Sequence, residues 1–160
     1  MFNFLKKKKN PLESIPSDVS VPNDEEMKYS FLSNQDLPKG FIYPTSFIKY
    51  IKYDTEVKEL EPYILFRDQD DVQTFNRVVK EQYPSRVLVP FGKDNYSDDV
   101  FCFDGTDTSG NPKVYIVHTY ASPGWEDKGY VKDFSAWLQF AQEAHDAYKK
   151  QREEEENHGD

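Results

Sequence analysis

The chain has 160 residues, of which 31% are charged and 16% aromatic, and its formal net charge is -9 at pH 7. Its length suits one domain with a modest core, and its aromatic content is too high for a disordered protein. The acidic balance argues against a general nucleic-acid binder, which needs a basic face. It suits a partner protein that is itself basic, although acidic charge alone is explained more simply as an aid to solubility.

The cysteine and hydropathy patterns bear on location. The single cysteine, Cys102, excludes an internal disulfide and any multi-cysteine metal site, and it predicts a reducing, cytoplasmic compartment. No apolar run reaches the roughly 18 to 20 residues that cross a bilayer, so we expect no membrane span. The lysine-rich start does not have the order of a signal peptide, because only a very short apolar piece precedes Lys6 to Lys9.

The N-terminal third predicts an arm followed by a short helix. Residues 1–23 contain three prolines and no apolar period, which predicts a flexible arm. We expect a single folded domain over residues 24–152. At its start, residues 25–32 fit a strand or a helical turn. The apolar stripe in residues 44–53 predicts a short helix, with Pro44 acceptable in its first turn.

A strand and a second helix are expected next. Residues 60–66 predict a strand, and Pro62 confines it to a sheet edge or a strand start. The span from Asp68 to Gln82 predicts a helix, since carboxylates crowd its first turn and apolar residues recur along one face. Pro84 ends this helix because the residue before a proline avoids the helical region.

The centre of the chain predicts consecutive antiparallel strands. Three runs rich in β-branched and aromatic residues, 86–92, 99–104 and 113–120, are separated by clusters of Gly, Asn, Asp, Ser and Pro. A last short strand is expected at 129–132.

The C-terminal part predicts the longest helix, from Asp133 to about Arg152, with apolar residues at helical spacing. We expect the like charges of residues 153–160 to form an acidic disordered tail. The fold class is therefore α+β, a mainly antiparallel sheet of several strands packed by helices, with a long C-terminal helix.

No pattern of residues predicts catalysis. Cys102 and His118 lie on neighbouring predicted strands, but Cys102 is flanked by two phenylalanines and is expected to pack in the core. The histidines lack metal-ligand spacing, so we expect no metal and no cofactor. Asp104 follows an apolar run and is expected to begin a turn.

The two tryptophans have different surroundings. Trp137 lies on the apolar stripe of the last helix and is expected in the core. Trp125 lies in a loop of proline, glycine and charge, where an exposed tryptophan is a frequent binding residue. The alternative is that its ring folds back on the sheet as a lid. The candidate partner-binding residues, taken from acidic and aromatic loops, are Asp94, Tyr96, Asp98, Asp99 and Trp125.

The order of several motifs resembles one known family. Leu-Pro-x-Gly at 37–40 precedes the short helix, and Val-Leu-Val-Pro-Phe-Gly at 87–92 precedes an acidic loop and Asp-Val-Phe-Cys-Phe-Asp at 99–104. Val-Tyr-Ile-Val-His at 114–118 and Asp-Phe-Ser-Ala-Trp-Leu at 133–138 follow. Over roughly residues 37–145 the chain is similar to the SUKH superfamily, which groups fungal cell-wall assembly regulators with bacterial toxin-immunity proteins.

The resemblance implies an α+β fold and a function without catalysis. Bacterial members of this superfamily typically bind and neutralise a toxin domain, often a nuclease. We therefore expect an immunity protein, not an enzyme, in which carboxylates meet the lysines and arginines of a basic toxin. One alternative is a regulatory adaptor that binds another protein. Another is a small-molecule binder or hydrolase with a pocket around Asp104 and His118.

Overall fold

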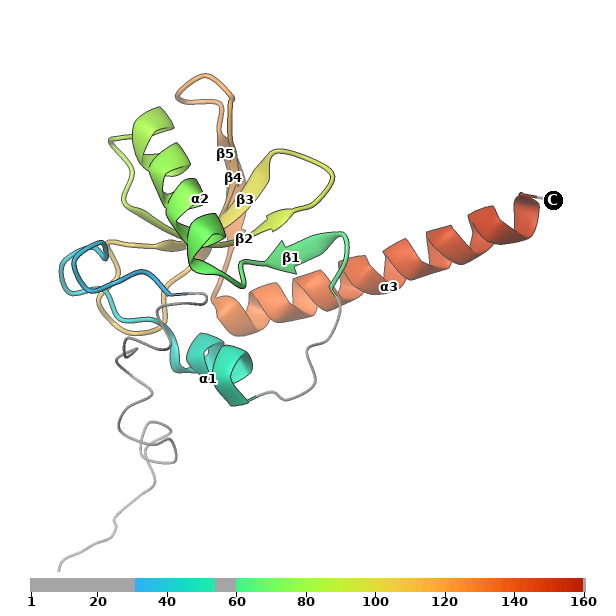
Figure 1. The fold of residues 1–160 in the computed structure, drawn as a ribbon, viewed down its shortest axis with the longest axis horizontal. Helices are drawn as coiled ribbons and strands as arrows, with labels where there is room; N and C mark the ends of the chain where they lie inside the picture. The colour runs from blue at the N-terminus through green and yellow to red at the C-terminus, as the bar shows by residue number, and fades with distance from the viewer. Residues whose placement is uncertain (1–30, 54–59, 160) are drawn as a thin grey trace, which may run out of the picture.

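The computed structural model describes residues 31–53 and 60–159. The predicted arm, residues 1–23, and most of the segment 25–32 lie outside the described residues. The part described has the predicted α+β fold (Figure 1). Its elements in chain order are α1 (Thr45–Tyr53), β1 (Tyr63–Leu65), α2 (Gln69–Gln82), β2 (Leu88–Asp94), β3 (Asp99–Asp104), β4 (Val114–His118), β5 (Asp127–Val131) and α3 (Phe134–His158).

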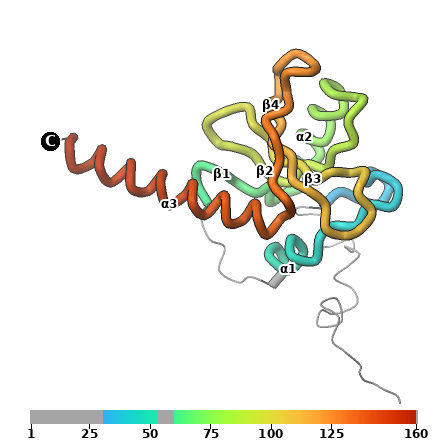
Figure 2. Tube along the Cα trace, turned by 180° about the vertical axis from the view of Figure 1, so that it is seen from behind, coloured from blue at the N-terminus to red at the C-terminus, as the bar shows by residue number. Residues whose placement is uncertain are grey.

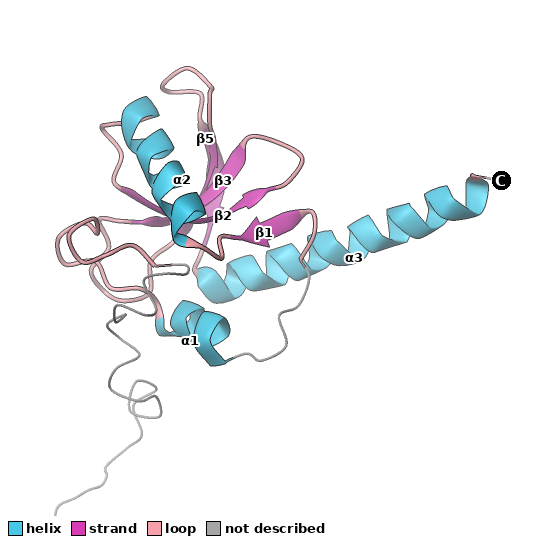
Figure 3. Cartoon of the chain, in the orientation of Figure 1, coloured by secondary structure: helices cyan, strands magenta, loops and turns pink. Residues whose placement is uncertain are grey.

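The strands form one antiparallel sheet in the order β1-β2-β3-β4-β5, so each strand pairs with its neighbour in sequence (Figure 3). The predicted consecutive strands are thereby confirmed, and β1 is an edge strand as the proline before it indicated. Cys102 pairs with Tyr115 across β3 and β4, and Phe103 pairs with Val114. Since side chains alternate along a strand, Phe101 and Phe103 face one side of the sheet and Cys102 faces the other.

Aromatic side chains fill the core on the side of the sheet covered by α1 and α3. The Phe47 ring of α1 lies 5.2 Å from Phe103 and 5.1 Å from Phe134 between ring centroids. Trp137 is fully buried, as predicted, with its ring 5.0 Å from that of Phe91. Edge-to-face contacts of this kind add to the stabilisation from burial. Helix α2 lies on the other side of the sheet (Figures 1 and 2).

Helix α2 begins and ends where the sequence predicts. The Asp68 side chain caps it by accepting a hydrogen bond from the Asp71 backbone N–H at 2.9 Å. The final turn closes on Tyr83, whose backbone N–H donates to the Val79 carbonyl. Pro84 follows directly. The end of α2 lies close to the connection between β4 and β5, where the Tyr83 hydroxyl donates to the Ala121 carbonyl.

Helix α3 is longer than predicted, because it continues through the glutamate run to His158. The prediction of a disordered tail from residue 153 is therefore wrong over residues 153–158. Glutamate is a good helix former, and Lys149, Lys150 and Arg152 lie four residues before Glu153, Glu154 and Glu156, a spacing that offsets like-charge repulsion. The C-terminal half of α3 extends away from the rest of the protein (Figures 1 and 2).

Gly92 makes a close approach between β1 and β2 possible, and it supports one stability prediction. A Cβ atom at residue 92 would lie 2.6 Å from the Ile64 carbonyl oxygen, a backbone atom that cannot turn aside. We expect Gly92→Ala to lower the free energy of unfolding by about 2 kcal/mol in urea titrations, because the clash separates β1 from the sheet. Gly110→Ala is the control: Gly110 has open space around it, so an alanine there meets only the strain of the positive φ of 88°, which should cost about 1 kcal/mol. Equal losses in the two variants would contradict this explanation.

Candidate protein-binding surface

The connection between β4 and β5, residues 119–126, carries two highly exposed aromatic side chains, and we call it the aromatic loop. Trp125 is 80% exposed and Tyr120 is 70% exposed, which makes them the two most exposed large hydrophobic residues of the described chain. The alternative that Trp125 folds back as a lid on the sheet is therefore wrong. Exposure on this scale favours a surface that another molecule covers.

The local sequence explains why Trp125 points outward. The Trp125 backbone N–H donates to the Ser122 carbonyl at 2.8 Å, which closes a four-residue turn. Pro123 supplies the fixed φ that the second position of such a turn prefers, and Gly124 adopts a φ of 99° at the third position. This is a type II turn built from residues suited to it, so the tryptophan emerges from a defined backbone.

Glu126 holds the C-terminal end of the aromatic loop in place. Glu126 is only 6% exposed, and its carboxylate accepts hydrogen bonds from the Gly124 backbone N–H at 2.6 Å and from Arg86 Nη1 at 2.9 Å. Its carbonyl accepts from the His118 backbone N–H at 2.7 Å. The exposed Trp125 therefore precedes a buried, ion-paired residue that fixes the loop to the start of β2.

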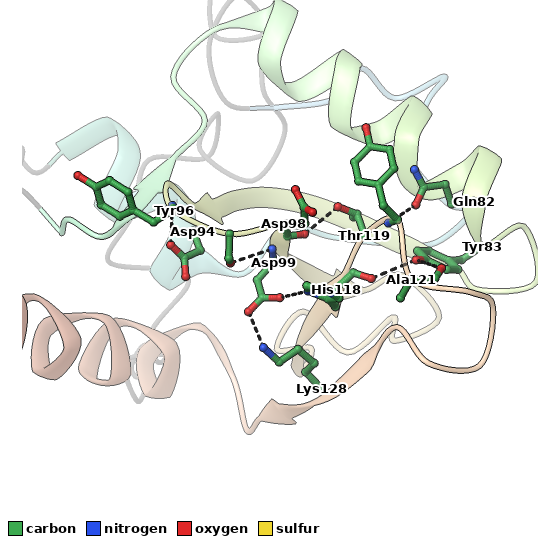
Figure 4. A network of polar contacts seen from close by, with 12 residues as sticks. Gln82, Tyr83, Asp94, Tyr96, Asp98, Asp99, His118, Thr119, Ala121 and Lys128 are labelled. Atoms are coloured by element: carbon green, nitrogen blue, oxygen red, sulfur yellow. Dashed lines mark hydrogen bonds and ion pairs between the residues drawn. The ribbon is translucent and has the colours of Figure 1, made fainter.

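The end of α2 holds the other half of the aromatic loop. The Tyr83 hydroxyl donates to the Ala121 carbonyl at 2.8 Å, and the Gln82 side chain accepts from the Tyr120 backbone N–H at 2.6 Å (Figure 4). Tyr120 itself has a φ of 67°, an uncommon backbone conformation for a residue that is not glycine. The loop is thus held at both ends, and binding would lose little conformational entropy there.

The Glu126 environment makes stability depend on pH. Burial by itself raises the pKa of Glu126, but the hydrogen bonds that its carboxylate accepts from the backbone N–H groups of Glu126 and Gly124 and from Arg86 outweigh burial, so the pKa lies below its ordinary value of 4.5. A lowered pKa means that the carboxylate stabilises the fold above pH 4.5, and that this contribution is lost as the pH falls through the folded-state pKa. We expect Glu126→Gln to reduce the loss of unfolding free energy between about pH 5 and about pH 3. An unchanged pH dependence would contradict this role.

The acidic turn between β2 and β3 lies beside the aromatic loop. The Asp98 carbonyl accepts hydrogen bonds from the Thr119 backbone N–H at 3.0 Å and from its hydroxyl at 2.7 Å (Figure 4). Asp98 is exposed, and Asp94, which accepts from the Tyr96 backbone N–H at 2.9 Å, is half-buried. The structure therefore brings carboxylates and exposed aromatic residues to one end of the sheet.

Two of the candidate residues make contacts within the protein. Asp99 is only 9% exposed, and its carboxylate contacts His118 Nδ1 at 2.7 Å and Lys128 Nζ at 2.9 Å. Tyr96 is exposed, but its hydroxyl hydrogen-bonds to Glu61 and to Tyr148 on α3. The Glu61 hydrogen bond raises the pKa of Tyr96, and the bond to Tyr148 adds to this. In Figure 4 the Tyr96 ring points away from the aromatic loop.

The pairs considered for catalysis do not come together. His118 pairs with Asp99 and Cys102 with Tyr115, so the two side chains face opposite sides of the sheet. Burial raises the pKa of the Cys102 thiol, which disfavours the reactive thiolate. Asp104 accepts hydrogen bonds from the Thr106 backbone and hydroxyl, as expected for a residue that begins a turn. It lies at the other end of β3 from the Asp99–His118 pair, so the alternative site around Asp104 and His118 does not bring these two side chains together.

Two features are absent from the part of the chain that the structure describes. Within residues 31–53 and 60–159, no three His, Cys, Asp or Glu side chains are grouped so that they could hold a metal ion. Over the same residues, no helix has the length and apolar character required to cross a membrane.

Sequence reasoning found Trp125 but missed the residues that support it. Arg86 lies 40 residues before Glu126 in the sequence. Tyr120 and Glu126 lie in the loop itself, but no pattern of neighbouring residues marks a role for them. The Ser122–Trp125 segment did contain the proline and glycine of a type II turn, a signal that could have predicted the outward direction of the tryptophan.

Comparison with known proteins adds no assignment. No protein-family model matches the chain, and neither a curated protein nor a solved structure matches it significantly.

Proposed function

We propose that this protein is a non-catalytic binding module that works as an immunity protein, by covering a basic toxin domain with its aromatic loop. The observation that carries the proposal is the 80% exposure of Trp125 on a loop that hydrogen bonds and an ion pair hold in place. Tryptophan and tyrosine are the commonest anchors of protein interfaces. A site for small-molecule chemistry would instead need polar groups converging in a cleft.

Charge supports a basic partner. The chain has a net charge of -9, and Asp98, which is exposed, lies next to the aromatic loop. Acidic groups around an aromatic centre would speed encounter with a lysine- and arginine-rich surface and exclude acidic proteins. The choice of a nuclease-type toxin rests on the resemblance to the SUKH superfamily. Because a nuclease toxin acts inside the cell, this choice supports a cytoplasmic location.

The proposal assigns different roles to the five candidate residues. Trp125 is the anchor and Asp98 is part of the charged rim, whereas Asp99 and Tyr96 act mainly within the protein. Asp94 shapes the acidic turn. Tyr120 joins the site as a second anchor, although the sequence alone did not single it out.

The test takes as the candidate partner any toxin domain that is encoded next to this gene. Cells that express the toxin should survive when they also express the intact protein, and the two proteins should form a complex in a pull-down. Trp125→Ala should lose both effects, while Lys149→Ala, on the exposed end of α3, should lose neither. Survival without complex formation would end the proposal, as would complex formation that does not depend on Trp125.

A regulatory adaptor remains the second candidate, because the same loop would serve any protein partner. A gene neighbourhood that contains no toxin, together with a Trp125-dependent complex with some other protein, would favour it.

A further inference from the structure

The basic side chains near the aromatic loop are already engaged with buried acids of the same protein. Arg86 Nη1 lies 2.9 Å from the Glu126 carboxylate, and His118 Nδ1 and Lys128 Nζ lie 2.7 Å and 2.9 Å from the two oxygens of Asp99. Glu126 and Asp99 are only 6% and 9% exposed. These pairs belong to the fold, so a partner of the aromatic loop must be selected by other charges.

The carboxylate of Asp98 is such a charge. Asp98 is exposed, and it is joined to Thr119 through its backbone carbonyl, which accepts from the Thr119 backbone N–H at 3.0 Å and from its hydroxyl at 2.7 Å (Figure 4). Within residues 31–53 and 60–159, the Asp98 side chain has no hydrogen bond or ion pair. Both carboxylate oxygens are therefore open to a ligand.

Backbone pairing places Asp98 and Trp125 on the two sides of Thr119. The His118 backbone N–H donates to the Glu126 carbonyl at 2.7 Å, so the next residues along the hairpin, Thr119 and Trp125, face each other across the loop. Two strand spacings set the Asp98 and Trp125 backbones about 10 Å apart. Thr119 is only 2% exposed, so a ligand at this point meets the side chains on either side of it.

An exposed indole beside an unpaired carboxylate suits one kind of basic side chain. A guanidinium is planar, so it can stack on an indole face while the N–H groups in its plane donate in pairs to a carboxylate. A lysine ammonium is compact and strongly hydrated, and it cannot form both contacts with the same geometry. Trp125, which is 80% exposed, has its ring accessible for such stacking.

We propose that the aromatic loop binds an arginine side chain of its partner, with the guanidinium stacked on the Trp125 indole and its N–H groups donating to the Asp98 carboxylate. This inference rests on the proposed function and names the group that the loop takes from the basic partner. The net negative charge attracts any basic protein, whereas this contact selects one that presents an arginine at the centre of its surface.

The experiment needs no toxin. The full-length protein is titrated with the peptide acetyl-Gly-Arg-Gly-amide and with its lysine and citrulline analogues, while NMR follows the indole N–H signals, which Trp125→Phe assigns. The arginine peptide should shift the Trp125 signal saturably and bind at least about threefold more tightly than the lysine peptide. Citrulline keeps the shape but has no charge, and should bind more weakly than either. Equal binding of the arginine and lysine peptides would overturn the proposal, as would the absence of a saturable shift.

Asp98→Asn tests the carboxylate and leaves the loop in place, because Thr119 is held by the backbone carbonyl of residue 98. We expect affinity for the arginine peptide to fall at least about threefold in this variant. Glu153→Gln removes the same charge from the exposed end of α3 and should leave the affinity unchanged. If both variants lose affinity equally, net charge controls binding and the proposal fails.

The outcome is separate from that of the immunity function. A Trp125-dependent toxin complex in a protein that does not distinguish the arginine and lysine peptides would overturn arginine recognition alone. Selective arginine binding that depends on Asp98, in a protein that protects no cell from a toxin, would support arginine recognition and end the immunity proposal.

Discussion

Trp125→Ala is expected to weaken binding of the toxin domain at least about 30-fold, equivalent to about 2 kcal/mol, while unfolding free energy changes by no more than about 0.5 kcal/mol. The two effects separate because the Trp125 side chain is 80% exposed and contributes little to the core, yet a partner would bury it completely. Isothermal titration calorimetry gives the binding change, and urea unfolding gives the stability change.

Tyr130→Ala is the matched control for this prediction. Tyr130 is 58% exposed on β5, in the same hairpin, but its ring packs against Tyr115 at a centroid distance of 6.0 Å and lies away from the aromatic loop. We expect a much smaller change in affinity. If the two variants lose affinity equally, the partner binds the face of β4 and β5 and not the aromatic loop.

The two tryptophans also make binding visible in the native protein. Trp137 is fully buried and should report only on unfolding, whereas Trp125 should shift its fluorescence to shorter wavelength when a partner covers it. Trp125→Phe should remove this change. A shift that persists in Trp125→Phe would come from Trp137, and would mean that binding alters the core.

Glu126→Ala should cost about 2 to 3 kcal/mol of unfolding free energy and also weaken toxin binding, although Trp125 is still present. Removing the carboxylate leaves the Gly124 N–H and the Arg86 guanidinium without their shared acceptor. The Arg86 side chain is 19% exposed, so water offsets part of the loss and the cost falls below that of a fully buried pair. Thermal unfolding and calorimetry measure the two effects.

Glu153→Ala, which removes the same side chain from the exposed end of α3, is the control for Glu126→Ala and should change stability little. Arg86→Leu combined with Glu126→Ala should restore part of the stability, since neither charge is then left unpaired. A double variant that is as unstable as the sum of the single variants would show that the ion pair does not hold the loop.

Most helices and strands of the fold could be predicted from local sequence patterns. Runs rich in β-branched and aromatic residues predicted the strands around Phe101 and Val117, and Asp68 marked the start of α2 because a carboxylate there can cap it. The C-terminal end of α3 could not be predicted in the same way. The repulsion within the glutamate run suggested disorder, whereas helix propensity and the lysines one turn earlier proved to matter more.

The candidate binding site could be predicted only in part from the sequence. Sequence reasoning placed Asp99 on a partner-facing surface because it treated the whole acidic turn as exposed. The register of β3 against β4 decides otherwise, since it sets Asp99 opposite His118, where Lys128 also reaches its carboxylate. Asp98, which directly precedes Asp99 in the sequence, is exposed.

The sequence by itself therefore determined the antiparallel meander, the helices and the core position of Trp137, because periodicity and capping act between residues close in the chain. Only the tertiary structure decided how the loop that carries Trp125 is held in place. That outcome depends on Arg86 and Tyr83, which lie about 40 residues before the loop and reach it only after β2 to β5 have paired. Contacts between residues so far apart leave no periodic signal in the chain.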